Sequence, residues 1–306
     1  MLTVLVAFAA NLLVAIAKSV AAALTGSASM LAEAAHSWAD TGNEIFLIVA
    51  ERRGSKASDE AHPLGYGKET YVWSMFAAFG LLSAGAAVSV LHGIQSLGAE
   101  ESGASPLVNY VVLAVAFVLE GTSFAQALRS TRAAALPSGL HPLRYINRTS
   151  DPTLRAVFVE DSTALVGLVV AAGGVGLEQA TGDPIWDALG SIVVGLVLAG
   201  AAIFLVSRNR DFLVGGGITG RIRQEALKAV LAHPLVSSVS YLHLEFVGPG
   251  KLLLVATVDI EGDDRESVLA VRLQEVEDQI RQHPMIETAV LSLSLPDEAH
   301  LEVEPG

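Results

Sequence analysis

The sequence predicts a polytopic α-helical membrane protein with six transmembrane helices, followed by a small α+β domain. Three observations lead to this fold class. The mean hydropathy is +0.50 and 52% of the 306 residues are hydrophobic, which is too apolar for a typical soluble domain. Six apolar runs each approach or exceed the length of about 20 residues that a spanning helix needs. After the glycines at 215–217, the pattern changes to that of a compact water-soluble domain.

The six predicted spans are apolar runs separated by polar connections. The first run lacks the basic segment that begins a signal peptide and is longer than the usual apolar core of one, so we expect an uncleaved span. In chain order, the predicted spans cover residues 2–24, 27–50, 70–97, 107–129, 154–180 and 185–206.

Charged residues alternate between the connections. The connections after the third and fifth spans have no Lys or Arg and carry Glu100, Glu101, Glu178 and Asp183 instead. Basic residues follow the second, fourth and sixth spans: Arg52, Arg53, Lys56 and Lys68; Arg129, Arg132, Arg144 and Arg148; Arg208 and Arg210. Because cytoplasmic connections are enriched in Lys and Arg, we expect both termini in the cytoplasm and the protein in the cell (inner) membrane.

The C-terminal part follows the order helix, strand, strand, helix, strand. The predicted elements are a helix at 221–232, strands at 236–246 and 252–260 with a Gly-Pro-Gly turn between them, a helix at 265–281 and a strand at 286–295. This order favours a ferredoxin-like α+β fold. The expected organisation is therefore a membrane domain over 1–214, a cytoplasmic domain over 215–296 and an acidic, disordered tail over 297–306.

Composition limits the partners of the chain. The net charge is −13, and residues 211–306 hold 7 Lys and Arg against 16 Asp and Glu, which leaves −9 there. This acidic domain argues against binding to nucleic acid. Because the chain has no cysteine, it can form no disulfide, and any metal must bind imidazole, carboxylate, amide or water ligands.

The second predicted span contains ionisable residues that a lipid-embedded helix normally excludes. His36 and Asp40 are four residues apart, so their side chains leave the same helix face about one turn apart and can converge on one ion. Glu33 and Asn43 extend the same stripe. An uncompensated charge at the bilayer centre costs several kcal/mol, which makes these residues functional candidates.

The fifth predicted span carries Glu160 and Asp161 with no basic residue nearby. If the second and fifth helices pack together, His36, Asp40 and Asp161 offer one nitrogen and several carboxylate oxygens, a set that suits Zn²⁺ and tolerates Mn²⁺, Co²⁺, Fe²⁺ or Cd²⁺. The alternative is that these acids line a polar seam or lie near the lipid headgroups. Small residues around them would allow close packing: Ala34, Ala35, Ala39, Gly42 and Ala164.

Several motifs resemble those of the cation diffusion facilitators, and most closely their zinc-transporter branch. The motif elements are Asn11 and Lys18, His36-Ser-Trp-Ala-Asp40-Thr-Gly-Asn43, His62-Pro-Leu-Gly-Tyr-Gly-Lys68-Glu69, Asp151-Pro-Thr, Glu160-Asp161-Ser162 and Asp187. The resemblance covers nearly the whole chain. It implies a dimeric six-span metal transporter with a cytoplasmic ferredoxin-like domain, and a transport site that pairs His36 and Asp40 with Asp161.

The chain departs from the family pattern at one position. The residue four before Asp161 is Val157, which cannot ligate a metal. Asn43 is the first substitute for the missing ligand and Glu160 is the second, although neighbours on a helix point about 100° apart. Water is the third.

Histidines elsewhere are weaker candidates. His243 lies on a strand where relatives carry a metal ligand, but the last strand offers no partner, so we expect no strong binuclear site in this domain. His233 and His283 each precede a proline, where capping of the helix end is the favoured role. His62 and Glu69 could hold a second, loop-borne ion.

The function predicted from these features is efflux of a divalent cation, most readily zinc, in exchange for protons by a homodimer in a lipid bilayer. Metal and protons compete because His36 must be neutral, and Asp40 and Asp161 ionised, to bind the ion. One alternative is a membrane regulatory protein whose core has lost transport, with Val157 as its sign. The other is an intramembrane metalloenzyme, for which the spans hold no His-Glu-x-x-His pair, so we predict neither an enzyme nor a resident cofactor.

Overall fold

The computed structural model describes residues 2–98, 107–262, 264–295 and 297–303, with side chains from Asn11 onward. The connection that contains Glu100 and Glu101 lies outside the described residues. The chain forms two compact units, one of residues 1–51 and 72–210 and the other of residues 52–71 and 211–306.

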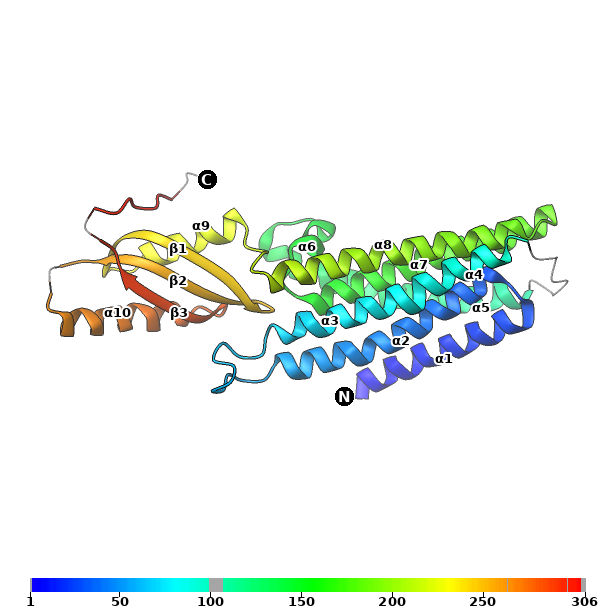
Figure 1. Cartoon of the computed structure of the whole chain (residues 1–306), viewed down its shortest axis with the longest axis horizontal. Helices are drawn as coiled ribbons and strands as arrows, with labels where there is room; N and C mark the ends of the chain where they lie inside the picture. Colours follow the sequence, from blue (N-terminus) through cyan, green and yellow to red (C-terminus); the bar gives the residue numbers. More distant parts are fainter. Residues whose placement is uncertain (1, 99–106, 263, 296, 304–306) are drawn as a thin grey trace. The chain divides into compact units, whose positions relative to one another are not determined.

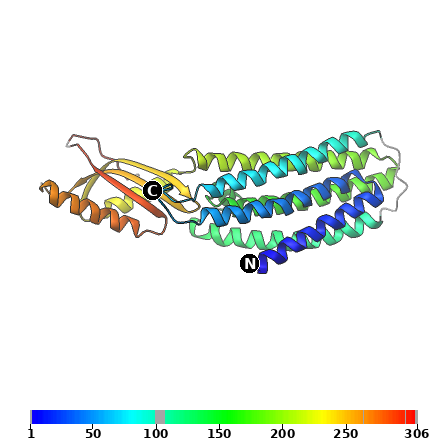
Figure 2. The same cartoon turned by 60° about the horizontal axis from the view of Figure 1, so that its bottom comes forward.

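The first unit consists of long helices that run side by side (Figures 1 and 2). Its unbroken long helices are α1 (Leu2–Thr25), α2 (Ala28–Gly54), α5 (Leu107–Ala135), α7 (Pro152–Thr181) and α8 (Ile185–Leu213). Two short segments, η2 (Leu136–Ser138) and α6 (Pro142–Arg148), connect α5 to α7. Among the described residues, four helical segments are long and apolar enough to cross a membrane: Glu69–Ser96, Leu107–Ser138, Pro152–Thr181 and Ile185–Leu213.

The segment predicted as a single third helix contains a π-helical turn. It comprises α3 (Glu69–Gly80), the π-helix η1 (Leu81–Ala87) and α4 (Val88–Ser96). Glycines lie where neighbouring helices approach closely: a Cβ on Gly80 would lie 3.2 Å from Asn43 Oδ1, and one on Gly85 would lie 3.2 Å from Leu198 Cδ1. The change of helical pitch therefore depends on packing against α2 and α8, which local sequence does not reveal.

Carboxylate side chains complete two helix N-termini, one from the adjacent residue and one from a distant helix. Asp151 caps α7 by accepting hydrogen bonds from the backbone N–H groups of Thr153 and Leu154, both at 3.0 Å. Asp187, in the first turn of α8, accepts hydrogen bonds from Ser27 Oγ at 2.9 Å and from the backbone N–H of Ala28. A carboxylate at this position satisfies exposed donors and complements the helix dipole.

The second unit contains a three-stranded sheet and two helices in the predicted order. The elements are α9 (Gly220–Leu231), β1 (Val236–Gly248), β2 (Lys251–Ile260), α10 (Glu266–Arg281) and β3 (Ile286–Leu293). The central strand β2 pairs antiparallel with β1 and parallel with β3. The first strand is two residues longer than predicted, and the last ends two residues earlier.

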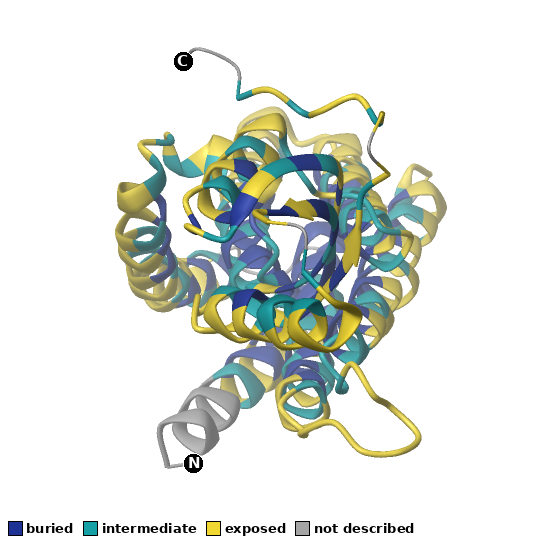
Figure 3. Cartoon of the chain, turned by 90° about the vertical axis from the view of Figure 1, so that its left-hand side faces the viewer, coloured by how far each residue is buried: buried dark blue, intermediate teal, exposed yellow. Residues whose placement is uncertain are grey.

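The core of this unit lies between one face of the sheet and both helices. Alternate residues of β2 are buried, from Leu252 through Ile260, as expected for a strand with one face covered. Those from Leu254 through Ile260 join Leu227 and Val230 of α9 and Val276 of α10 in one apolar cluster. Figure 3 shows the contrast between buried residues in dark blue and the exposed outer surfaces of the helices in yellow.

The tail was wrongly predicted to be disordered over its described part. The backbone N–H of Leu301 donates to the carbonyl oxygen of Val239 at 2.7 Å, and Ser240 Oγ donates to Glu298 Oε2 at 2.7 Å. Leu301 and Val303 pack against the core. These apolar residues bury enough surface to hold an otherwise acidic segment in place.

The connection between α2 and α3 belongs to the second unit. Lys68 Nζ lies 2.5 Å from Glu245 Oε1 of β1, and the ring of Tyr71 stacks on that of Phe212 with 5.3 Å between centroids. A Cβ on Gly67 would lie 2.5 Å from the carbonyl oxygen of Val247, so only glycine allows this approach. Much of the His62–Glu69 motif therefore serves packing within this unit.

Candidate metal site

His36 and Asp40 of α2 lie close together, and their polar atoms are incompletely satisfied. His36 Nε2 lies 3.2 Å from Asp40 Oδ2, and the His36 side chain is 1% exposed. Within the described part of the chain, neither His36 nitrogen nor Asp40 Oδ1 has a hydrogen-bond partner that meets geometric criteria. Buried polar atoms in this state can accept an ion, a proton or water.

Asp40 borders a small polar cavity among α1, α2, α5 and α7, whereas His36 is not part of its lining. The cavity has a volume of about 80 Å³, enough for an ion together with some of its water. Its lining is mostly polar and comprises Asn11, Ser37, Asp40, Glu44, Leu47, Glu120, Ser123, Val157, Glu160 and Asp161. The structure thus places Asp40 and Asp161, two of the three predicted core ligands, in the lining of one cavity.

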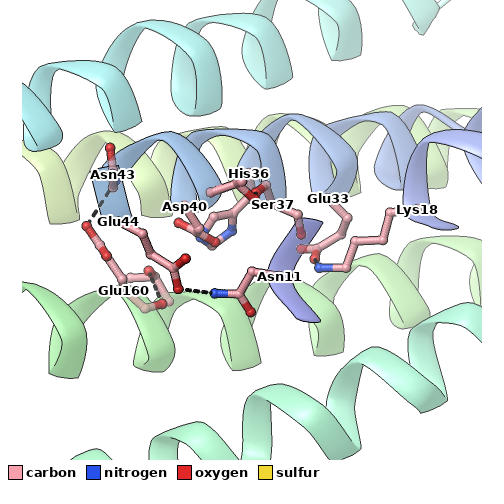
Figure 4. A network of polar contacts seen from close by, with 11 residues as sticks. Asn11, Lys18, Glu33, His36, Ser37, Asp40, Asn43, Glu44 and Glu160 are labelled. Atoms are coloured by element: carbon pink, nitrogen blue, oxygen red, sulfur yellow. Dashed lines mark hydrogen bonds and ion pairs between the residues drawn. The ribbon is translucent and has the colours of Figure 1, made fainter. Parts of the chain in front are cut away.

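Glu160 also faces this cavity, although its position next to Asp161 on α7 predicted a different direction. Its side chain is buried, and Asn43 Nδ2 donates to Glu160 Oε1 at 3.0 Å (Figure 4). Asn43 is not part of the cavity lining. Its amide orients Glu160, which makes the two residues a linked pair across α2 and α7.

Asp161 is held from a third helix. Ser123 Oγ of α5 donates to Asp161 Oδ2 at 2.9 Å. Val157 lies beside it in the lining and offers no ligand. In the described residues, no three His, Asp or Glu side chains are close enough to hold a metal as they stand. The candidate ligands surround the cavity without converging on one point.

A buried ion pair lies one turn before His36. Lys18 Nζ of α1 lies 2.9 Å from Glu33 Oε2 of α2, with side-chain exposures of 1% and 0% (Figure 4). Gly167 of α7 brings its backbone close to the same carboxylate: a Cβ there would lie 2.4 Å from Glu33 Oε1. Glu33 is therefore compensated by a cation of the chain itself and joins α1, α2 and α7.

Sequence reasoning missed three cavity residues: Asn11 as a contact of the site, Glu44 and Glu120. Asn11 Nδ2 donates to Glu44 Oε1 at 2.6 Å (Figure 4). The signal that could have identified both acids was available, because each is an ionisable residue within a predicted span. Glu44 lies four residues beyond Asp40, outside the His36 motif, and Glu120 lies on another helix. The sequence therefore gave no sign that either residue lines the same cavity as Asp40.

The two candidates for a loop-borne ion have different partners. His62 Nδ1 lies 3.5 Å from Asp59 Oδ1, and its ring contacts that of Tyr66 with 3.9 Å between centroids. Glu69 Oε2 instead lies 3.7 Å from Arg53 Nη1. The structure does not bring His62 and Glu69 together.

Histidines of the second unit have structural contacts. Nδ1 of His233 accepts the backbone N–H of Leu235 at 3.2 Å, and Nδ1 of His283 accepts that of Met285 at 3.3 Å. Both imidazoles thus accept a hydrogen bond within the turn that follows a helix. The role predicted from the sequence was capping of the helix end. His243 Nε2 lies 3.9 Å from Glu245 Oε2.

The expected small-residue packing is found in part. Ala34, Ala39 and Ala164 are buried, whereas a Cβ on Gly42 would meet no atom within 4 Å. Ala35 is half-buried. Close approach near the site depends instead on Gly167, which the sequence did not single out.

Comparison with known proteins gives a consistent result. A family described as "Cation efflux transmembrane domain" matches residues 4–214. Metal tolerance protein C4 of Arabidopsis thaliana is 35% identical over 233 residues, which is 76% of this chain and 51% of that protein. The proton-coupled zinc antiporter SLC30A9 is 34% identical in Xenopus laevis and 32% identical in Homo sapiens, each over 85% of this chain and 46% of the relative. The chain spans about half the length of these relatives.

Proposed function

Because the chain belongs to the cation efflux family, we propose that it transports a divalent metal ion, most readily Zn²⁺, out of the cytoplasm in exchange for protons. The observation that carries this proposal is the polar cavity between α2 and α7, which Asp40 and Asp161 line within otherwise apolar helices. Lipid-embedded carboxylates without a cation of their own favour a site that binds one. One relative, the SLC30A9 protein of Xenopus laevis, is named as a proton-coupled zinc antiporter, which agrees with this assignment.

His36, Asp40 and Asp161 are the proposed core ligands, with Asn43 and Glu160 as an auxiliary pair. An imidazole and two carboxylates match the ligand preference of Zn²⁺ and also accept Mn²⁺, Co²⁺, Fe²⁺ or Cd²⁺. Asn43 orients the Glu160 carboxylate toward the cavity through its 3.0 Å hydrogen bond. Glu160 thereby becomes the better of the two substitutes for the ligand that Val157 lacks.

The contact between His36 and Asp40 provides the basis for exchange. At 3.2 Å from Asp40 Oδ2, a protonated His36 forms an ion pair with the carboxylate and offsets its charge. A metal ion needs the same nitrogen lone pair and the same carboxylate charge. Binding of the ion therefore displaces the proton, and reopening of the cavity to the other side allows the reverse exchange.

The proposed topology has six spans: α1, α2, the broken helix α3–η1–α4, α5, α7 and α8. Basic connections after α2, α5 and α8 place both termini in the cytoplasm, and we propose the cell (inner) membrane as the location. The membrane domain covers 1–214, the cytoplasmic ferredoxin-like domain 215–296 and the tail 297–306. The family resemblance supports a homodimer.

The second candidate function is a regulatory membrane protein with an inactive transport core. The observation that favours it is Val157 in the cavity lining, where a ligand is expected. An intramembrane metalloenzyme is the weaker rival because the predicted spans hold no His-Glu-x-x-His pair.

A flux measurement tests the proposal. Proteoliposomes containing the native chain should take up zinc when a pH gradient is imposed and should stop when the gradient is collapsed. Asp40→Ala and Asp161→Ala should abolish uptake, and Asn43→Ala should weaken it by releasing Glu160. Asp183→Ala, in an exposed connection, is the matched control and should transport normally. Absence of zinc and manganese flux in the native chain would favour the regulatory protein.

A further inference from the structure

Helix α5 presents two polar residues to the cavity on one face. Glu120 and Ser123 are three residues apart, which places their side chains on adjacent turns of the same side of the helix. The 2.9 Å hydrogen bond from Ser123 fixes this face against Asp161. The α5 face is therefore in register with the proposed ligands of α2 and α7.

The proposed site lacks one ligand. Structural and transport sites for Zn²⁺ commonly use four ligands, but His36, Asp40 and Asp161 supply three. Glu160 already accepts the amide of Asn43. Glu120 is the remaining carboxylate of the lining that, within the described part of the chain, receives no hydrogen bond, although its charge interacts with those of Lys18 and Asp40.

Unsatisfied polar atoms indicate that the cavity holds a ligand. Ser37 is 3% exposed and lines the cavity, yet its Oγ has no partner among the described residues, and the same is true of Asp40 Oδ1. A buried hydroxyl or carboxylate oxygen without a partner costs about 1–3 kcal/mol. An ion with bound water in the cavity would satisfy both atoms.

We propose that Glu120 ligates the transported cation and completes the set of His36, Asp40 and Asp161. This inference rests on the proposed function and adds α5 as a third ligand-bearing helix. Three carboxylates and one imidazole form a site richer in oxygen than one with two imidazoles, so Glu120 should also support binding of harder ions such as Mn²⁺. The departure at Val157 is then compensated from a different helix.

The test is a Co²⁺ titration of the full chain in lipid nanodiscs. The visible absorption of Co²⁺ is much stronger in four-coordinate than in six-coordinate sites, so it reports both affinity and ligand number. Glu120→Gln should weaken Co²⁺ binding about tenfold or more, since loss of even an outer-shell group costs about 10–100-fold. It should also change the absorption spectrum, and Zn²⁺ should displace Co²⁺ more readily.

Asp183→Asn, in an exposed connection outside the cavity, is the matched control, because it also removes one carboxylate charge and should leave affinity and spectrum close to native. Native-like affinity and spectrum in Glu120→Gln would overturn the inference, as would an equal loss in Glu44→Gln, whose carboxylate lines the same cavity. If Glu120→Gln does not fold, Glu120→Asp decides: an unchanged spectrum and affinity overturn the assignment, and a change in both supports it.

The two proposals fail in different ways. A native chain that neither binds Co²⁺ nor transports zinc would overturn the proposed function. A native chain that transports zinc, with Glu120→Gln binding Co²⁺ as the native chain does, would overturn only the role of Glu120.

Discussion

Replacement of Gly167 by alanine should disturb the buried ion pair beside the proposed site. The added Cβ would lie 2.4 Å from Glu33 Oε1, and carbon atoms essentially never approach closer than 3.0 Å, so the carboxylate must move by at least 0.6 Å. Glu33 cannot move freely because its other oxygen is bonded to Lys18 at 2.9 Å. Overpacking of this kind costs about 1–3 kcal/mol, and full loss of a buried ion pair costs about 3–5 kcal/mol.

The assay is thermal unfolding of the protein in nanodiscs at a fixed scan rate. A loss of 1–3 kcal/mol should lower the apparent Tm by about 3–10 °C for a unit of this size. Gly173→Ala, on the same helix, is the control, since its Cβ would meet no atom within 4 Å. Glu33→Asp shortens the carboxylate side chain and should recover part of the loss in Gly167→Ala. Equal Tm values for Gly167→Ala and Gly173→Ala would refute the reasoning.

Three other predictions concern contacts away from the ligands. Asp187→Ala should destabilise the protein by about 1–2 kcal/mol by removing the acceptor at the start of α2, while Glu60→Ala, in an exposed connection, should not; equal Tm values would contradict this. Arg155→Met should lower the Tm more strongly, because the fully buried guanidinium joins α6, α7 and α8. Hydrogen bonds to charged groups contribute about 1.5–3 kcal/mol each. A native Tm in Arg155→Met would show that these hydrogen bonds contribute little. The Tyr66 hydroxyl donates to Asp59 Oδ2 at 2.7 Å and holds the pKa of Asp59 below its ordinary value. This contact therefore stabilises the loop at neutral pH and is lost as the pH falls through the lowered pKa of Asp59. Tyr66→Phe should raise the pKa of Asp59 in a carboxyl NMR titration, and an unchanged pKa would contradict this prediction.

Much of the architecture could be predicted from the sequence because lipid imposes simple demands. A spanning segment must satisfy its backbone internally and expose apolar side chains, so runs of apolar residues locate the long helices. Alternation in 252–260 similarly located the central strand of the sheet. The π-turn over Leu81–Ala87 could not be found this way, since it depends on the contacts of Gly80 and Gly85 with other helices.

The candidate site was only partly predictable. The spacing of His36 and Asp40 is a local property of one helix, and it predicted that the two side chains lie close together, as their 3.2 Å contact shows. Grouping Asp161 with them required packing between helices far apart in sequence, for which the small residues and the family resemblance were the guides. Glu120 carries no local motif, and its relation to the cavity emerges only when α5 packs against α7.

The hydrogen bonds from α2 to Asp187 bear on the order in which the protein can assemble. Synthesis proceeds from the N-terminus, so α2 emerges from the ribosome well before Asp187, which lies 160 residues after Ser27. The pair of Lys18 and Glu33, separated by 15 residues, can close as soon as the first helical hairpin exists. The backbone N–H groups of Ala28 and Ser29 lack this acceptor until α8 arrives. The contact between the start of α2 and Asp187 is thus expected to be among the last to form as the bundle assembles.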